Sequence, residues 1–177
     1  QFVDRFLEVT KAIVVGDPSD EKTQVGPLVS AQQRQSVEGY LNSAKLRRFA
    51  CGGNRVGGKG YYLAPTVVLD CETSDAIWKE EVFGPVVCIR AFDNEEQMLR
   101  EVNDSPYGLS GSLWTRDLGR ALRVAKRIES GVLSINSNSS VHVEAPFGGF
   151  KQSGIGRDLG TAAMEGYTEL KNVYVGT

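Results

Sequence analysis

Apolar residues near the beginning of the chain recur at helical spacing. The positions on one face are Phe2, Phe6, Val9 and Ile13. They predict an amphipathic helix over residues 2–14. A second helix is predicted after Ser30, because the sequence Ser-Ala-Gln-Gln from Ser30 to Gln33 has the Ser-x-x-Gln spacing of a capping box. Both helices need an apolar surface to pack against.

Glycine-rich stretches interrupt the next part of the chain. Three β-prone runs, residues 49–51, 61–63 and 66–69, are separated by glycine-rich stretches at 52–53 and 57–60. Glycine clusters of this kind are typical of tight reversals between strands. The runs are therefore predicted to be short strands or extended arms.

From residue 86 onward, predicted strands and helices alternate. The strands are residues 86–92, 109–115 and 132–136, and the helices are residues 94–103 and 117–130. In the second helix Gly131 is expected to provide the C-terminal stop, and the side chains expected to face inward are Leu118, Leu122, Ala125 and Ile128. Because parallel neighbours need a crossover connection, the alternation predicts an α/β fold, a parallel sheet with covering helices.

Composition and charge narrow the class of protein. The chain has 177 residues, of which 41% are apolar and 24% charged, enough for one sizeable core. Its 20 basic and 22 acidic residues are interspersed and give a formal charge of -2, so there is no basic stripe for a phosphate backbone. Nucleic acid is not expected as a partner.

The cysteines and the single histidine do not have the spacing of a metal-binding site. Cys51, Cys71 and Cys88 have no Cys-x-x-Cys spacing, and His142 does not complete a zinc site with them. A reduced, cytoplasmic setting is expected. No apolar stretch approaches the roughly 18 residues needed to cross a membrane, and Gln1 runs directly into a helical pattern. We expect the chain to be a piece of a longer protein.

The candidate binding stretch is the turn Glu80-Glu81-Val82-Phe83-Gly84-Pro85, which opens onto an apolar run. Two carboxylates beside a phenyl ring, followed by Gly-Pro, suggest a ligand-facing turn at a strand's edge. From residue spacing alone, the two glutamates are equally well explained as the solvated end of a helix. His142, in the loop 137–145, has the same two interpretations, a pocket lining or a solvated side chain.

No reaction centre is visible in the chain. None of the three cysteines has a paired histidine, and Cys88 lies within a predicted buried strand, so all three are interpreted as structural thiols. The glycines at 154, 156 and 160 do not fit a dinucleotide fingerprint, because the third is one place late and no strand precedes them. A loop folded closely over the sheet explains them better.

The motifs together resemble the NAD(P)-dependent aldehyde dehydrogenase superfamily in order and spacing, over essentially the whole chain. They are Gly16-Asp17-Pro18, Gly26-Pro27, Gly60-Tyr61-Tyr62 with Pro65-Thr66, the turn 80–85, Asn103 with Tyr107-Gly108-Leu109, Gly131 with Asn136, the run 146–157, and Tyr167-Thr168 with Lys171.

The resemblance implies that residues 1–166 are the C-terminal part of an aldehyde dehydrogenase catalytic domain and that 167–177 are an oligomerisation strand. In that family a cysteine attacks an aldehyde, a hydride passes to NAD or NADP, and water activated by a glutamate hydrolyses the thioester. The resemblance places the nucleophile, the general base and the Rossmann domain upstream. No catalytic residue is therefore assigned here, and the chain alone is expected to be inactive. The alternative is a naturally shortened binding or oligomerisation module.

The resemblance assigns candidate site residues to the positions of this chain that match the family's motifs. Glu81 is similar to the glutamate that binds the nicotinamide ribose, and Phe83 to the ring beside the nicotinamide. Phe147 resembles the aromatic wall of the aldehyde tunnel, and the substrate-selecting loop before it contains Val141, His142 and Val143. The polar residues in this loop favour a polar aldehyde. The intact enzyme is expected to be a homo-oligomer, a dimer or tetramer.

Overall fold

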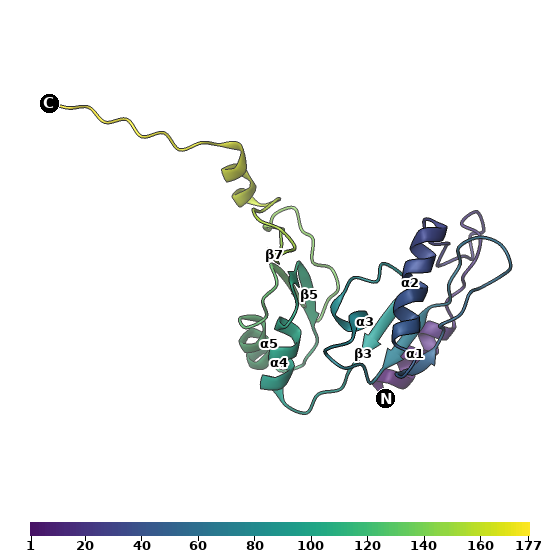
Figure 1. Ribbon diagram of the computed structural model, residues 1–177. Helices are drawn as coiled ribbons and strands as arrows, with labels where there is room; N and C mark the ends of the chain where they lie inside the picture. Colours follow the sequence, from purple (N-terminus) through teal and green to yellow (C-terminus); the bar gives the residue numbers. More distant parts are fainter. The chain divides into compact units, whose positions relative to one another are not determined.

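The computed structural model describes residues 1–177, and the chain divides into two units, Gln1–Ala91 and Phe92–Thr177 (Figure 1). This division lies inside the segment assigned to the catalytic domain. The boundary expected between residues 166 and 167 stays a prediction. None of the helices is long and apolar enough to cross a membrane.

The first unit is built on a three-stranded sheet of order β1-β2-β3. β1 pairs antiparallel with β2, whereas β2 and β3 run parallel with Thr66 opposite Val86. The elements of this unit are α1 (Phe2–Lys11), α2 (Ala31–Ser43), β1 (Arg48–Cys51), β2 (Thr66–Leu69), α3 (Ala76–Lys79) and β3 (Val86–Ile89).

The core of the first unit lies between α2 and this sheet. Val37 and Leu41 of α2 are buried in one cluster with Val68 of β2 and Ile77 of α3. All four residues of β2 are buried because β2 is the central strand. The helix that supplies this face begins where predicted, since the Ser30 hydroxyl accepts a hydrogen bond from the backbone N–H of Gln33 at 3.1 Å.

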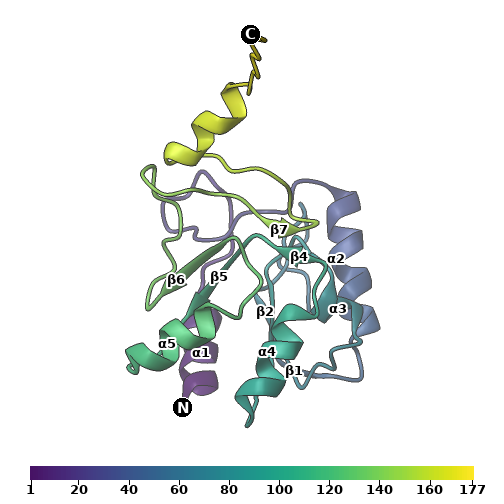
Figure 2. The same ribbon diagram turned by 90° about the vertical axis from the view of Figure 1, so that its left-hand side faces the viewer.

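The second unit contains two small sheets. β5 and β6 run parallel with Ser110 opposite Val132, and β4 pairs antiparallel with β7 (Figure 2). The elements are α4 (Glu95–Asn103), β4 (Tyr107–Gly108), β5 (Ser110–Leu113), α5 (Leu118–Ala125), β6 (Val132–Ile135), β7 (Phe150–Lys151) and the 3-10 helix η1 (Thr161–Tyr167).

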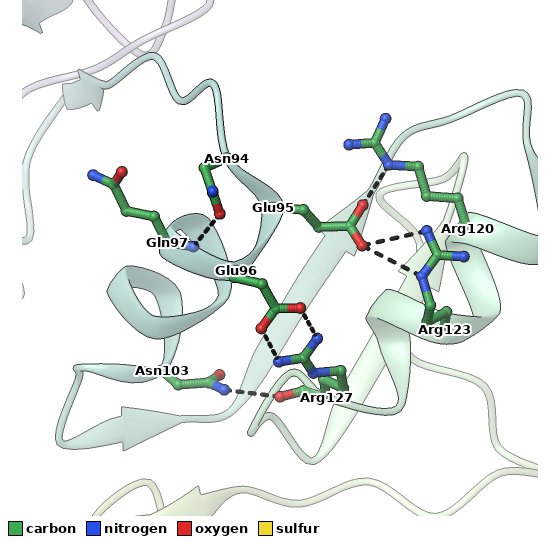
Figure 3. Close-up of polar contacts among 8 residues, drawn as sticks. All are labelled: Asn94, Glu95, Glu96, Gln97, Asn103, Arg120, Arg123 and Arg127. Carbon is green, nitrogen blue, oxygen red and sulfur yellow. Dashed lines mark hydrogen bonds and ion pairs between the residues drawn. The ribbon is translucent and has the colours of Figure 1, made fainter.

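Ion pairs tie α4 to α5 in this unit (Figure 3). Glu95 accepts a hydrogen bond from Nε of Arg120 at 2.7 Å and forms a second ion pair with Arg123 at 3.3 Å. Glu96 binds the guanidinium of Arg127. The amide of Asn103 continues the link by donating to the Arg127 carbonyl at 2.8 Å. Charged side chains at the surface therefore link α4 both to α5 and to Arg127, which follows α5 in the chain.

The α/β class is confirmed, but the predicted continuous parallel sheet is not what the structure shows. Parallel pairing occurs twice, as β2 with β3 and as β5 with β6, and these pairs belong to different sheets. The run at residues 61–63 is also not a strand, because only an isolated bridge joins Leu63 to Arg55. Alternating sequence patterns predict strands, whereas pairing depends on which segments meet in three dimensions.

The helix predicted over 117–130 is shorter in the structure, and it buries a different face from the one expected. It ends at Ala125, and its buried residues are Ala121 and Val124, while Leu118 and Leu122 are 66% and 50% exposed. The buried face is centred on the two smaller residues, so the leucines lie at its margin. Gly131 does not stop this helix.

Gly131 has a packing role instead. A Cβ atom at Gly131 would collide with the backbone carbonyl of Gly148. Two backbone segments therefore approach each other closely at a point where only glycine fits.

The strand expected over residues 167–175 is not formed in the single chain. Tyr167 ends η1, and residues 168–177, yellow in Figure 1, have no regular secondary structure. Leu170, Val173 and Val175 are largely or fully exposed. A strand needs a neighbour for its backbone hydrogen bonds, and no segment of this chain pairs with these residues.

Candidate functional site

The turn at residues 80–85 connects α3 to β3 and carries the two residues expected to contact a cofactor. Phe83 adopts a left-handed backbone conformation with φ of 49°, and its side chain is 71% exposed. Glu81 is exposed, and its carboxylate has neither a hydrogen bond nor an ion pair within the chain. Both side chains are thus presented outward from one turn.

The structure distinguishes the two neighbouring glutamates. The carboxylate of Glu80 accepts a hydrogen bond from the Tyr40 hydroxyl at 2.7 Å. Glu80 is therefore tied to α2, whereas both carboxylate oxygens of Glu81 remain available as acceptors. This difference argues against regarding the pair as one solvated helix end.

A groove of about 320 Å³ lies against this turn. Its walls combine aromatic and aliphatic side chains with polar atoms, among them the carboxylate of Glu80. The lining residues are Ile77, Trp78, Glu80, Val82, Phe83, Gly84, Val86 and Cys88.

Close packing against α2 explains the glycine in the turn. A Cβ atom at Gly84 would lie 2.7 Å from Cγ2 of Val37, which is fully buried. The turn therefore lies directly on the helix, and its backbone has little room to shift toward the core.

The residues expected to select the substrate lie in the second unit, in the loop that follows β6. Val141 and Val143 are 57% and 71% exposed, and His142 is also exposed. The loop contains one internal turn, in which the Ala145 N–H donates to the His142 carbonyl at 3.0 Å. These three side chains are presented on one short segment, without a packed layer around them.

Both ends of this loop are anchored. At the start, the Asn136 side-chain amide pairs with Thr115: Oδ1 accepts from the Thr115 N–H and Nδ2 donates to its carbonyl, each at 2.9 Å. At the end, Phe147 forms an antiparallel bridge with Asp158 through hydrogen bonds of 2.7 and 2.8 Å. The middle of the loop is held as well, because the Gly160 N–H donates to the Val143 carbonyl and the Ser134 hydroxyl donates to the Ser139 carbonyl, each at 3.0 Å.

The glycine-rich run after Phe147 folds closely on its surroundings, as expected. Arg157 donates from Nη1 to the carbonyls of Gly149 and Gly156 at 3.1 and 2.6 Å, and its guanidinium lies 5.4 Å from the centre of the Phe150 ring. Lys151 Nζ reaches the Asn103 carbonyl at 2.6 Å. Arg157 therefore binds two backbone carbonyls within the run, and Lys151 links the run to the C-terminal end of α4.

Cys71 and Cys88 are in environments that disfavour a thiolate. Burial raises the pKa of Cys71, and burial followed by the neighbouring Cys71 raises the pKa of Cys88 to about 12. The Cys88 thiol contacts the Ile77 carbonyl at 3.5 Å. Since a nucleophilic cysteine acts as the thiolate, both remain interpreted as structural.

Sequence reasoning missed the residues of α2 that hold the turn. The sequence pattern identifies Gln33 only as part of a capping box and gives no role at the turn to Val37 or Tyr40. The Gln33 side chain in fact reaches the turn. The spacing of Gln33, Val37 and Tyr40 on one helical face was the available signal, but it does not identify a partner so distant in sequence.

Comparisons with known proteins agree with the resemblance. The model of the aldehyde dehydrogenase family matches residues 1–173. The chain therefore belongs to the aldehyde dehydrogenase family.

Curated relatives at high identity are named as betaine aldehyde dehydrogenases. Betaine aldehyde dehydrogenase 1 of Rhizobium meliloti is 49% identical over 180 residues, which cover 99% of this chain and 37% of that protein. The chain thus spans somewhat more than a third of the length of such relatives.

Solved structures show the same fold. A Bacillus cereus aldehyde dehydrogenase carrying the E194S substitution superposes with a TM-score of 0.92 at 39% identity, covering 98% of this chain and 36% of that one. The betaine aldehyde dehydrogenase of Staphylococcus aureus in complex with NAD+ gives 0.87 at 39% identity, covering 94% and 34%.

Proposed function

We propose that this chain is part of an enzyme that oxidises an aldehyde to a carboxylic acid with NAD(P)+, and that the turn 80–85 binds the nicotinamide end of the cofactor. The observation that carries the proposal is the pair Glu81 and Phe83, which one rigidly backed turn presents outward. Membership of the aldehyde dehydrogenase family supports it. So does the NAD+ complex of the similar Staphylococcus aureus protein.

The chemistry of the two side chains suits this role. Glu81 has both carboxylate oxygens available, so it can accept from the two adjacent hydroxyls of a ribose. The exposed ring of Phe83 can lie against a flat heterocycle and restrict the movement of that heterocycle, which favours the geometry of hydride transfer. When bound, NAD(P)+ supplies the hydride acceptor.

The aldehyde is proposed to meet the loop carrying Val141, His142 and Val143, with Phe147 as an aromatic wall. Glu144 adds a negative charge next to His142. Similar proteins are named for betaine aldehyde, an aldehyde with a cationic group. We therefore propose a polar or cationic aldehyde as the substrate, since a carboxylate and an aromatic ring both favour a cation.

The nucleophilic cysteine, the general base and the Rossmann domain are proposed to lie in the remainder of a longer protein. The chain covers only 37% of a relative at 49% identity. The raised pKa of both Cys71 and Cys88 is consistent with a nucleophile elsewhere. A cytoplasmic location, expected from the free thiols, stays a prediction.

The test uses the full-length protein that carries this chain. Replacing Glu81→Gln is expected to raise KM for NAD(P)+ about tenfold or more, because hydrogen bonds to a charged group are lost. KM for betaine aldehyde should change little. The matched control is Glu21→Gln, an exposed glutamate without a partner in the structure, which should behave like wild type.

Two results would contradict the proposal. One is a KM for NAD(P)+ that E81Q leaves within twofold of wild type. The other is a full-length protein that reduces no NAD(P)+ with any of betaine aldehyde, a short aliphatic aldehyde and an aromatic aldehyde. The second result would favour the shortened, non-catalytic module instead.

We also propose that residues 167–177 pair with a second copy of the protein, giving a dimer or tetramer. Their exposed apolar side chains and unpaired backbone support this assignment. Light scattering of the full-length protein and of a form ending at residue 167 tests it. An unchanged mass after truncation would count against the proposal.

A further inference from the structure

We propose that Gln33 is a positioning residue for the cofactor: its side-chain amide sets the backbone of the turn so that Phe83 and Glu81 meet the nicotinamide end of NAD(P)+. The inference rests on the function proposed above and adds to it a residue of α2 remote in sequence from the turn. No contact between Gln33 and the cofactor is required.

One amide group of Gln33 holds two successive carbonyls. Its Nε2 donates to the Val82 carbonyl at 3.2 Å and to the Phe83 carbonyl at 3.0 Å, across separations of 49 and 50 residues. A side-chain amide has two N–H donors, so both bonds can form together. The carbonyl oxygen of the amide is not needed for either bond.

The two carbonyls belong to the peptide planes on either side of the Phe83 Cα. Fixing these two planes fixes the φ and ψ angles of Phe83. Phe83 has φ of 49°, a left-handed conformation that a large side chain rarely adopts and that persists only when the surroundings enforce it. Because the ring is 71% exposed, packing of the ring does not enforce it. The Gln33 amide provides the missing constraint.

Gln33 is itself held in place. It occupies the third position of α2, where its backbone N–H donates to the Ser30 hydroxyl at 3.1 Å. One and two turns further along the same face, Val37 packs against Gly84 and Tyr40 bonds Glu80. The turn is therefore attached to one face of a capped helix at three successive places, and Gln33 supplies the attachment nearest to Phe83.

The experiment measures NAD(P)+ and aldehyde kinetics of the full-length protein with two changes at this position. Gln33→Leu keeps the approximate size of the side chain and removes the donors. Gln33→Glu also removes them, but a glutamate at the third helical position after a serine cap favours the helix. The Glu variant therefore separates loss of positioning from loss of folding.

Both variants are expected to raise KM for NAD(P)+ about tenfold, the loss of roughly two neutral hydrogen bonds. KM for the aldehyde should stay within twofold of wild type. The control Gln35→Leu alters an exposed residue of the same helix that has no side-chain partner and should leave both constants unchanged. A merely structural role would lower the unfolding midpoint of Q33L and leave the KM of Q33E unchanged.

The possible results separate the two proposals. If wild-type turnover depends on Glu81 while Q33L and Q33E keep the wild-type KM for NAD(P)+, the positioning role is overturned and the cofactor site stands. If the wild-type protein shows no NAD(P)+-dependent turnover, the proposed function fails, and the positioning role fails with it.

Discussion

The first unit has a larger buried apolar core than the second. All but three of the fully buried apolar residues belong to the first unit, and the exceptions are Leu99, Ala121 and Val124. Ion pairs occur in both units, for example Arg47 with Asp75 in the first and Arg120 with Glu95 in the second. Exposed ion pairs contribute little free energy each, so the difference between the two units lies in how much apolar surface each one buries.

The two candidate binding segments also differ in how closely they pack against a buried core. The turn 80–85 lies on α2 and contacts a buried valine. The loop 137–145 is anchored by Asn136 at its start and then carries exposed side chains. The side chains of the proposed substrate loop are exposed, so they can change without disturbing the core, whereas a change in the turn 80–85 meets the buried face of α2.

The largest expected effect comes from the apolar core of the first unit. Leu41→Ala, at a site 6% exposed, should lower the free energy of unfolding by about 2–5 kcal/mol through the cavity that it leaves. Leu122→Ala, at a site 50% exposed in α5, should cost no more than about 0.5 kcal/mol. Urea unfolding followed by far-UV circular dichroism measures both. Equal losses would show that α5 buries its leucines after all.

A smaller effect is expected where the turn meets α2. Gly84→Ala should destabilise by about 1–3 kcal/mol, since the new methyl group meets Val37. Gly39→Ala, within α2 and with open space around it, should instead stabilise by about 0.5–1 kcal/mol. Thermal unfolding monitored by Trp78, which lines the groove, compares the two. Shifts of the same sign would refute the close-packing argument.

The smallest effect concerns the charges of the second unit. Hydrogen bonds from Arg120 and from Arg127 lower the pKa of Glu95 and of Glu96, respectively, below the ordinary value. Because the folded-state pKa is the lower one, the stabilisation is present above the unfolded value of about 4.3 and is lost as pH falls through the folded pKa.

The variant E95Q/E96Q should therefore unfold at lower urea than wild type at neutral pH. The difference should shrink in acid below about pH 4 and also with added salt. A difference that is independent of pH would mean that packing, rather than charge, joins the two helices.

The sequence by itself determined the local features and the family. Ser30 caps its helix as predicted, and Asn94 caps the helix predicted to begin there, because a cap involves only residues within one turn. The run at 66–69 is a strand as predicted, and the strand predicted over 86–92 is formed over Val86–Ile89. The ordered motifs indicated the aldehyde dehydrogenase family, which the family match confirms.

Only the tertiary structure decided which segments meet. Sequence spacing could not tell Glu80 from Glu81, because the difference is Tyr40, forty residues away. It also could not show that Gln33 would hold the backbone of Phe83, or that α5 would turn its leucines outward. Local sequence patterns reflect the secondary-structure preferences of neighbouring residues. These contacts instead join residues far apart in the sequence, so they form only when the whole unit folds.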